Sequence, residues 1–456
     1  MKSQANYMVA VIGAGPAGLF AARELALKNV HVMLFNRDVK PGGLAEYGIY
    51  PEKYKMKAGL RAQFRQILGL EGIDYYGNVT VGERGDIQLG EFCEMGFQAV
   101  LVTVGAQGTK WLGLPGETLE GVYHAKDLVY HYNRLPPFSE RQFHIGRRVA
   151  VIGAGNVMLD IARYLATQKQ VEEVTSVIRR GPAEVKFSKA ELENVGTLLD
   201  LTDLDQELAR VTPVMQSVGQ DPQDFRKFIG LALQRAHPNH SNARLLLRFL
   251  VSPTRILGNE HGRMVGLEVD ENTLVLKDGS VAARSLGSSH IMDVDTVIYA
   301  IGDRVDDSFG LPVKGSEYLK YPEPRFPIEG NSYEVYDPND NCPAGGIFVA
   351  GWSRKASDGL VGVARRDGSM GSKAVLAYLK TQPPLEQLSL DCVTERIAKI
   401  PKPVVTKVEL ARLEAVELEH ARQLGLEEFK FGTNQEMFEA IGFFPLSVSD
   451  AVDARL

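Results

Sequence analysis

Two glycine-rich turns carry the clearest chemical signal in this chain. The segment VAVIGAG occurs at residues 9–15 and again, unchanged, at residues 149–155. Each copy is a short β-branched run followed by glycines and then by a helical pattern. Glycines at this place let the backbone turn tightly and approach a pyrophosphate, and free N–H groups at the start of the next helix favour anions. The repeat therefore predicts two strand–turn–helix units that each bind a nucleotide.

The first copy has the full pattern G-x-G-x-x-G, running from Gly13 to Gly18. The strand expected after its helix spans residues 30–35, and an acidic residue that binds a ribose hydroxyl usually stands at its end. This chain has Asn36 there, and Asp38 is close enough to substitute. An amide can still bond a hydroxyl, so we expect Asn36 to contact ribose. The alternative is an ordinary residue at the end of a strand.

The second copy has Met158 at the third glycine position, which predicts a looser contact between helix and strand. The strand expected after its helix, residues 174–178, ends in Arg179 and Arg180 instead of an acid. Guanidinium groups bind phosphate with two parallel hydrogen bonds and keep their charge. The pair therefore favours NADP(H), with its 2′-phosphate, over NAD(H). A solvated arginine pair in a loop is the alternative.

Two dinucleotide sites in one chain suit a flavin and a nicotinamide, because hydride transfer needs the two rings near contact. Apolar runs at residues 99–106, 295–303 and 345–352 are typical of buried strands, and the last should return the chain to the first domain. We therefore predict an α/β protein with two Rossmann-like dinucleotide-binding domains, the NADP domain inserted into the FAD domain. The FAD domain would comprise residues 1–110 and 332–456, and the NADP domain residues 111–331.

Composition narrows the protein class. The chain has 456 residues, enough for two or three domains at roughly 150 residues each. Its formal net charge of −6 argues against non-specific binding to nucleic acid. Cys93, Cys342 and Cys392 stand far apart, which predicts no metal site, no redox-active cysteine pair and a reducing compartment. We find no secretion signal and no apolar run of about 18 residues, so we expect a cytoplasmic protein without a membrane span.

Several spaced motifs together resemble the adrenodoxin reductase type of ferredoxin–NADP reductase, within the glutathione-reductase-like flavoproteins. They are GAGPAG at 13–18, GNVMLDIAR at 155–163, RRGP at 179–182, FSKAELE at 187–193, LRFLVSP at 247–253 and AGW at 350–352. The resemblance implies an FAD site formed by Gly13, Gly15, Pro16, Ala17, Gly18, Asn36, Gly43, Leu44, Gly105, Gly351, Trp352, Gly359, Leu360 and Val361. It implies an NADP(H) site formed by Gly155, Asn156, Val157, Arg179, Arg180 and Glu191.

The chain departs from the family pattern at three positions: Asn36 replaces an acid, Met158 a small residue, and Lys53 a histidine. The resemblance implies that Glu191 hydrogen-bonds near the nicotinamide, and we name Glu191 and Lys53 as candidate catalytic residues. A lysine at position 53 would change the pH dependence or the choice of partner. A solvated loop lysine is the alternative.

The resemblance implies an enzyme that passes electrons from NADPH through FAD to a ferredoxin-like carrier. An acidic iron–sulfur or flavin carrier would need a basic docking surface, unless the charges are simply solvated. Two groups could supply it: Lys53, Lys55, Lys57, Arg61 and Arg65, and Arg226, Lys227, Arg235, Arg244 and Arg248. A helical appendage is expected from about residue 401, with a capping box at Thr406 and Glu409 and a helix through about residue 424. It could pack on the FAD domain, cover a site or mediate a homodimer.

Four other functions compete with electron transfer to a carrier protein. A dithiol or disulfide reductase would need a cysteine pair beside the flavin, which this chain lacks. An electron-input subunit of a larger complex and a flavin-dependent monooxygenase use the same cofactors. A non-enzymatic redox or nucleotide sensor would retain the fold but ignore NADPH.

Overall fold

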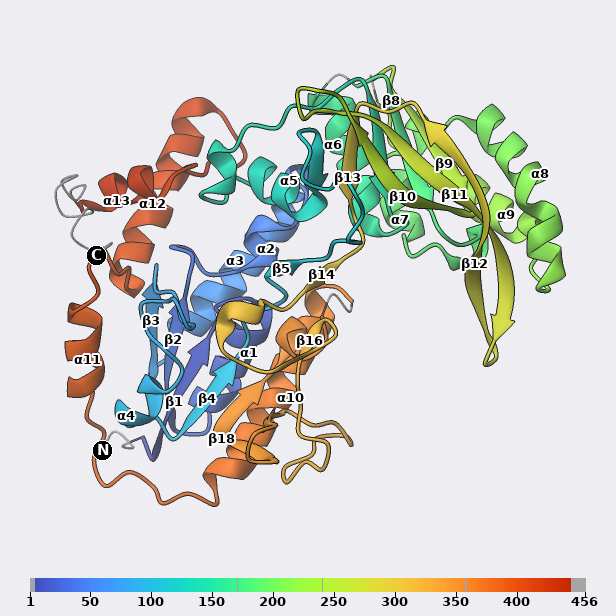
Figure 1. Cartoon of the computed structure of the whole chain (residues 1–456). Coiled ribbons are helices and arrows are strands. Elements are labelled where there is room, and N and C mark those ends of the chain that lie inside the picture. Colours follow the sequence, from blue (N-terminus) through green and yellow to red (C-terminus); the bar gives the residue numbers. More distant parts are fainter. Residues whose placement is uncertain (1–4, 170, 240, 357–358, 444–456) are drawn as a thin grey trace. The chain divides into compact units, whose positions relative to one another are not determined.

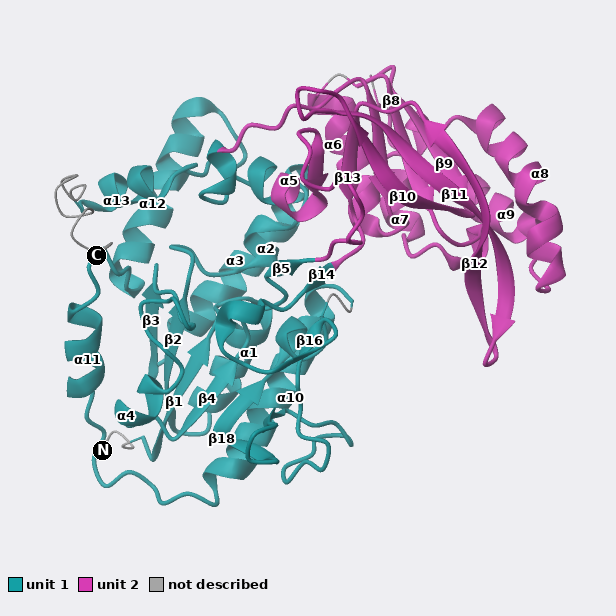
Figure 2. Ribbon diagram, in the orientation of Figure 1, with its two compact units in different colours: residues 1–109, 130–140, 303–456 teal, residues 110–129, 141–302 magenta. Residues whose placement is uncertain are grey.

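The structure is a computed structural model that describes residues 5–169, 171–239, 241–356 and 359–443 (Figure 1). The chain forms two compact units, coloured separately in Figure 2. Unit 1 comprises residues 1–109, 130–140 and 303–456, and unit 2 comprises residues 110–129 and 141–302. The segments of unit 2 thus lie between those of unit 1 in the sequence.

The two units divide the chain at different places from the predicted domain limits. Residues 303–331, expected in the NADP domain, group with unit 1. β14 (Asp303–Arg304) pairs antiparallel with β5 (Gly108–Thr109), and Phe309 and Tyr318 are buried in a core cluster of unit 1. Residues 130–140 also group with unit 1. These contacts favour a boundary near residue 303 instead of 332.

Unit 1 is built on a six-stranded sheet in the order β17-β18-β4-β1-β2-β3. Its strands are β1 (Tyr7–Ile12), β2 (Val30–Asn36), β3 (Ile73–Gly77), β4 (Ala99–Val102), β17 (Glu334–Asp337) and β18 (Cys342–Val349). All neighbouring strands run parallel except β17, which pairs antiparallel with β18. Val9 and Val11 of β1 face one core cluster, and Met8 and Ala10 face another. Both faces of the sheet are therefore covered, as expected for parallel strands.

Two long helices cover one face of this sheet, and further helices surround it (Figure 1). Leu19 and Leu25 of α1 (Pro16–Ala26) share a buried cluster with Val375 and Leu379 of α10 (Val361–Leu379). The other helices of unit 1 are α2 (Leu44–Tyr47), α3 (Tyr54–Leu68), α4 (Glu91–Glu94), α11 (Asp391–Ala398), α12 (Lys407–Leu424) and α13 (Asn434–Ile441). α12 begins with the predicted capping box of Thr406 and Glu409, and left-handed Gly425 follows its end.

Unit 2 contains a five-stranded parallel sheet in the order β6-β13-β7-β8-β9. Its strands are β6 (Val122–His124), β7 (Arg148–Ile152), β8 (Glu173–Ile178), β9 (Arg244–Phe249) and β13 (Thr296–Tyr299). Its helices are α6 (Asn156–Gln168), α7 (Lys189–Glu193), α8 (Leu201–Ser217) and α9 (Pro222–Leu233), and α5 (Ala125–Tyr132) crosses the unit boundary. A three-stranded antiparallel sheet consists of β10 (Val251–Gly258), β11 (Met264–Lys277) and β12 (Ser280–Met292).

Within the described residues, no helix is long and apolar enough to cross a membrane. The same residues contain no group of three or more His, Cys, Asp or Glu side chains that could hold a metal ion.

Candidate functional site

The first glycine turn joins β1 to α1 in unit 1. Gly13 has φ +103°, and a Cβ added there would lie 2.6 Å from the carbonyl oxygen of Thr103. A Cβ on Gly18 would lie 2.0 Å from the carbonyl oxygen of Gly13, so these two glycines are needed for the turn and for helix packing. Gly15 differs, because a Cβ added there meets no atom within 4 Å. The backbone at Gly15 therefore faces open space at the start of α1, the place at which the sequence predicts a pyrophosphate.

Asn36 has partners that the sequence did not predict. Its Oδ1 accepts a 3.0 Å hydrogen bond from the N–H of Ala14 in the glycine turn. Its Nδ2 donates to the carbonyl oxygens of Asp38 at 2.8 Å and Lys40 at 3.0 Å. The buried amide thus braces the turn against the loop that follows β2. A ribose contact by Asn36 stays a prediction. Asp38, the acidic residue proposed as its substitute, has a partly exposed side chain.

The short helix α2 starts directly against this turn. Gly42 donates a 2.7 Å hydrogen bond to the carbonyl oxygen of Ala14, and a Cβ on Gly43 would lie 3.2 Å from the Cα of Gly15. Leu44, the first residue of α2, packs on a small buried cluster formed by Tyr47, Tyr130 and Leu135. The structure therefore brings Gly43 and Leu44 to the edge of the first turn.

Residues after β18 reach the same turn from the far end of the chain. Gly351 has φ +66°, and its added Cβ would lie 2.6 Å from the Cβ of Ala17. Its N–H donates to Asp367 at 2.6 Å, and the N–H of Gly105 donates to the Ser353 hydroxyl at 2.9 Å. The sequence did not predict a role for Asp367 or Ser353, because neither residue belongs to a recognised motif that also contains the glycine it bonds to. They fix the backbone of predicted site residues.

The remaining predicted FAD residues lie at the start of α10. Gly359 has φ +73°, and Val361 is the first residue of the helix. The side chain of Leu360 is 67% exposed, which is unusual for an apolar residue. Trp352 is partly buried in the one-turn helix Gly351–Ser353. An exposed leucine at a helix start suits a surface that a ring system would cover.

The second glycine turn, between β7 and α6, repeats the geometry in unit 2. Gly153 has φ +134°, and its added Cβ would lie 2.4 Å from the carbonyl oxygen of Ala300. Gly155 again has no atom within 4 Å of an added Cβ, and α6 begins at Asn156. Met158 is fully buried, so the bulky side chain is accommodated in the core at the third glycine position. Val157 is 45% exposed in the first turn of α6.

The segment after β8 folds back onto this second turn. The N–H of Lys186 donates a 2.8 Å hydrogen bond to Ala154, and Asn156 Oδ1 accepts a 2.8 Å bond from the N–H of Ser188. Lys186 was not among the predicted site residues. Its position a few residues after the RRGP motif is the signal that could have identified it. A chain that leaves a strand end and returns to the glycine turn can place a second positive charge near a bound phosphate.

Arg179 and Arg180 follow β8 directly. Their carbonyl oxygens accept hydrogen bonds from Asn272 Nδ2 and from the N–H of Leu250, which fix the backbone. Arg179 is exposed and Arg180 is half-buried. In the part of the chain that the structure describes, neither guanidinium group has a hydrogen bond or ion pair. Two arginines without protein partners at the end of β8 are therefore candidates for binding an anion.

The two candidate catalytic residues belong to different units. Glu191 of α7 is half-buried, and its carboxylate accepts a 3.3 Å hydrogen bond from Asn194 Nδ2. Its N–H donates to the capping hydroxyl of Ser188 at 3.3 Å, which ties it to the segment on the second turn. Lys53 is half-buried at the start of α3. Roles for both in the reaction stay predictions.

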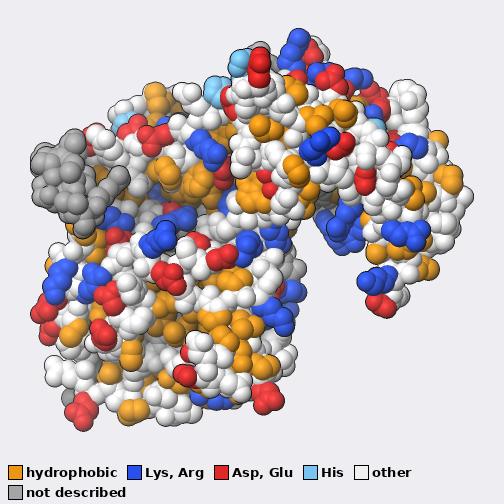
Figure 3. Space-filling view, in the orientation of Figure 1, with side chains coloured by type: hydrophobic (Ala, Val, Ile, Leu, Met, Phe, Trp, Pro, Cys, Tyr) orange, Lys and Arg blue, Asp and Glu red, His pale blue; other side chains and the backbone are white. Residues whose placement is uncertain are grey.

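Most cations of the two expected docking groups are engaged in ion pairs. Lys57 is 1% exposed and pairs with Glu428 at 2.6 Å. The other pairs are Arg61 with Glu46, Arg65 with Glu414, Arg226 with Asp205, Lys227 with Asp224, Arg244 with Glu173 and Arg248 with Asp203. On the face shown in Figure 3, positive and negative side chains are interspersed. The sequence left open whether these charges form a docking surface or are simply solvated, and the ion pairs favour the second interpretation.

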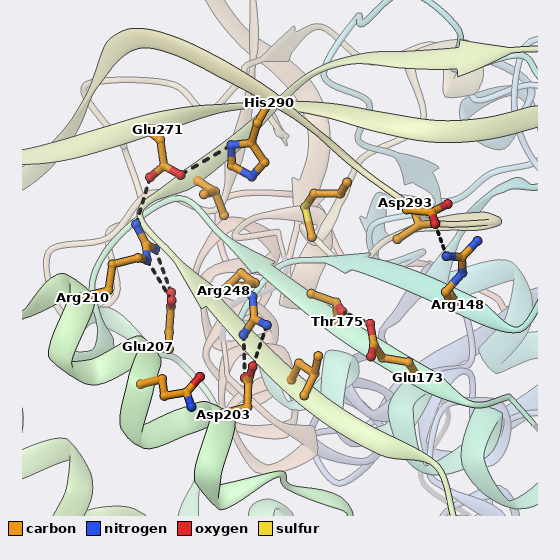
Figure 4. Close-up of a pocket in the computed structure, with 15 residues that line it drawn as sticks. Arg148, Glu173, Thr175, Asp203, Glu207, Arg210, Arg248, Glu271, His290 and Asp293 are labelled. Atoms are coloured by element: carbon orange, nitrogen blue, oxygen red, sulfur yellow. Dashed lines mark hydrogen bonds and ion pairs between the residues drawn. The ribbon is translucent and has the colours of Figure 1, made fainter.

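A pocket of about 670 Å³ in unit 2 lies apart from the predicted cofactor residues (Figure 4). The charged side chains that line it neutralise one another: Arg248 pairs with Asp203, Arg210 with Glu207 and Glu271, and Arg148 with Asp293. A phosphate group would have to break these pairs. The glycine turns are therefore better candidates for nucleotide binding than this pocket.

Comparisons with known proteins agree with this geometry. A family model described as pyridine nucleotide-disulphide oxidoreductase matches residues 7–196. The chain is 29% identical to NADPH-ferredoxin reductase FprA of Mycobacterium leprae over 408 residues, 80% of this chain and 83% of the relative. It is 29% identical to the mitochondrial NADPH:adrenodoxin oxidoreductase of Mus musculus over 417 residues, 82% of this chain and 78% of the relative.

The fold can be compared with that of a solved structure. The structure of Mycobacterium tuberculosis FprA in complex with NADPH superposes with a TM-score of 0.79 at 26% identity, covering 96% of this chain and 99% of the other. This agreement confirms the predicted fold class of two dinucleotide-binding α/β domains.

Proposed function

We propose that the chain belongs to the adrenodoxin reductase type of ferredoxin–NADP reductases, which its motifs resemble and to whose members it is similar over most of its length. It is an FAD-dependent oxidoreductase that takes electrons from NADPH and passes them through FAD to a ferredoxin-like or related one-electron carrier protein. The observation that carries the proposal is the pair of glycine turns. In each, the second glycine, Gly15 or Gly155, leaves open space at the start of a helix.

We assign FAD to the turn of unit 1. The pyrophosphate would lie at Gly15 and the start of α1, where backbone N–H groups and the helix dipole favour negative charge. Gly43 and Leu44 at α2, and Gly351 to Trp352 after β18, border that turn through the contacts described above. The start of α10, with exposed Leu360, would cover the ring system.

We assign NADP(H) to the turn of unit 2. The pyrophosphate would lie at Gly155 and Asn156, and the 2′-phosphate would accept hydrogen bonds from Arg179 and Arg180. The support for this assignment is that both guanidinium groups lack protein partners among the described residues, whereas Arg244 and Arg248 of the same unit form ion pairs. A bound phosphate would satisfy donors that the protein leaves open.

The protein supplies binding and orientation. The flavin, when bound, accepts hydride and releases single electrons, so no nucleophile or catalytic triad is required. Asn36, Asp367 and Ser353 hold the backbone of the FAD site, and Asn156 holds the segment that contains Glu191. Glu191 is proposed to hydrogen-bond near the nicotinamide, and Lys53 to influence proton movement or docking near the flavin.

The acidic nature of the carrier protein, the residues that dock it and the cellular compartment are also proposals. An acidic iron–sulfur or flavin carrier fits the family. Lys55 is exposed and is the remaining candidate for docking in the first basic group. Free Cys93, Cys342 and Cys392 suit a reducing compartment such as the cytoplasm. A homodimer through the C-terminal appendage stays open.

Anaerobic stopped-flow mixing tests the cofactor assignment. The purified yellow protein is mixed with NADPH or with NADH, and loss of the flavin absorbance is followed. Fast bleaching by NADPH and much slower bleaching by NADH are expected. A protein that holds FAD but is bleached by neither nucleotide would instead fit the sensor or subunit alternatives.

A further inference from the structure

A cluster of buried charged side chains joins the C-terminal appendage to the helix beside the first glycine turn. Four of its members come from the segment 40–61 and three from the appendage, and all but two are less than 7% exposed. The cluster, here called the appendage cluster, comprises Lys40, Glu46, Lys57, Arg61, Glu417, Glu428 and Lys430. Removing charged groups from water costs a large amount of free energy. This number of buried charges in one place therefore needs an explanation.

Glu46 of α2 is the centre of this cluster. Its carboxylate accepts two 2.6 Å hydrogen bonds from Arg61 of α3, and Lys40 lies 3.5 Å from it. Burial acts to raise the pKa of Glu46, but Lys430, Lys40 and Arg61 outweigh it and hold that pKa well below its usual range. The carboxylate is therefore ionised and strongly held although it is 2% exposed.

Lys430, which belongs to the appendage, contacts α2 at three points. Its Nζ donates a 2.8 Å hydrogen bond to the carbonyl oxygen of Glu46 and lies 3.1 Å from the Glu46 carboxylate. It also lies 5.0 Å from the ring centroid of Tyr47. Burial lowers the pKa of Lys430 to about 8, against Glu46 and Glu428, which raise it. Lys430 is therefore still charged at pH 7, and its main-chain contact holds the backbone of α2 as well as a side chain.

What Lys430 holds is adjacent to the FAD turn. The N–H groups of Glu46 and Tyr47 donate to the carbonyl oxygen of Gly43, at 3.0 and 2.8 Å. Gly43 in turn approaches Gly15, and Gly42 bonds to Ala14. A shift of α2 would therefore move the residues that border the glycine turn.

We propose that Glu46 and Lys430 are a positioning pair, through which the C-terminal appendage holds α2 against the FAD turn and so controls how tightly FAD is retained. This inference rests on the proposed function, because it takes FAD as the ligand of unit 1. It gives the appendage a role in the cofactor site, which the sequence left open between packing, covering a site and dimerisation.

The test compares Lys430→Gln with a matched control, Lys407→Gln. Lys407 also belongs to the appendage and donates a 2.6 Å hydrogen bond to a backbone carbonyl, that of Ile73 in β3. Both variants lose one charged donor to the main chain, but only Lys430 contacts α2. Apoprotein is titrated with FAD, and near-UV circular dichroism checks that each variant is folded.

Lys430→Gln is expected to weaken FAD binding about tenfold, equal to about 1.4 kcal/mol, and to shift the visible absorption band of bound FAD. Lys407→Gln is expected to change FAD affinity by less than about twofold. Lys430→Arg, which keeps the charge, should recover part of the affinity. If Lys430→Gln does not fold, the rate of FAD release from Lys430→Arg is measured, and a rate above that of the wild type is expected.

Three results would overturn the inference: unchanged FAD affinity and spectrum in folded Lys430→Gln, an equal loss in Lys407→Gln, or wild-type FAD release from Lys430→Arg where that measurement is needed. Equal affinity combined with lower thermal stability of apo and holo forms would mean that the cluster only stabilises the fold. A wild-type protein that binds no FAD at all would instead count against the proposed function.

Discussion

The side-chain oxygen Oδ1 of Asn156 accepts a 2.8 Å hydrogen bond from the backbone N–H of Ser188. This bond joins the first residue of α6, at the second glycine turn, to the segment that follows Arg179 and Arg180. The bond thereby links the second glycine turn, the arginine pair and Glu191 within unit 2. The predictions for the NADP(H) site follow from this arrangement.

Replacing both Arg179 and Arg180 with Ala should raise the KM for NADPH by at least about 100-fold. Each lost charge-assisted hydrogen bond is worth about 1.5–3 kcal/mol, and tenfold is about 1.4 kcal/mol. The KM for NADH should change less than about threefold, because NADH has no 2′-phosphate. Steady-state kinetics with both nucleotides measures this. Arg244→Gln, which alters an arginine already paired with Glu173, is the control, and similar losses for both nucleotides would remove the assignment of the arginine pair.

The two glycines of the second turn should respond in opposite ways to alanine. Gly155→Ala adds a Cβ into open space at φ −107°, so the free energy of unfolding should change by less than about 1 kcal/mol. NADPH binding should nevertheless weaken at least tenfold, because that space is assigned to the pyrophosphate. Gly153→Ala should destabilise the protein by more than about 2 kcal/mol, since it combines φ +134° with a 2.4 Å clash.

Thermal unfolding and NADP+ titration check the glycine pair. Normal NADP+ affinity in a folded Gly155→Ala variant would mean that the turn is structural and that the nucleotide lies elsewhere.

Lys186→Gln should raise the KM for NADPH and for NADH by the same factor, about three- to fivefold. The backbone of Lys186 is bonded to Ala154 in the turn, and its exposed side chain has no hydrogen bond or ion pair among the described residues. We therefore expect it to act on the pyrophosphate, which both nucleotides share. Lys189→Gln, on the same segment, is the control. An effect confined to NADPH would instead place Lys186 at the 2′-phosphate.

His124 should make unit 2 sensitive to acid. It is buried on β6, and burial, followed by the charge of Lys126, lowers its pKa from 6.5 to about 4. Between these values the unfolded chain binds a proton that the folded protein does not, so stability is complete above pH 6.5 and falls as the pH approaches 4. The loss due to this group should be about 3 kcal/mol.

Denaturant unfolding between pH 4 and 7 checks the histidine prediction. His124→Asn keeps an acceptor for the N–H of Lys126, to which His124 Nδ1 is bonded at 3.2 Å, but cannot titrate. Its free energy of unfolding should fall less steeply with acid than that of the wild type. Equal slopes would show that His124 titrates normally.

Local pattern was enough to predict the frame of both sites. Strand, glycine turn and helix are adjacent in sequence, so Gly13, Gly153 and the strands that precede them could be located, as could the arginines after β8. The capping box at Thr406 and Glu409 is equally local. In these segments the residues that decide the structure lie within a few positions of one another.

Contacts between distant segments could not be predicted in this way. Lys57 and Arg61 look like a basic helix face, but Glu428, more than 360 positions away, pairs with both. Asn36 is predicted to be a ribose ligand, and its bonds to Ala14 and the following loop could not be predicted from the sequence. The approach of Gly351 to Ala17 depends on how α10 and β18 return to the sheet. One sequence does not specify which distant charges or glycines meet.

The most direct test of the electron path is anaerobic double mixing. The protein is first reduced with one equivalent of NADPH and then mixed with an oxidised [2Fe–2S] ferredoxin, while flavin and iron–sulfur absorbance are followed together. Reoxidation of the flavin at the same rate as reduction of the ferredoxin is predicted. A flavin that NADPH reduces but that transfers no electrons to ferredoxin, or to a flavodoxin tested in parallel, would contradict the proposed function.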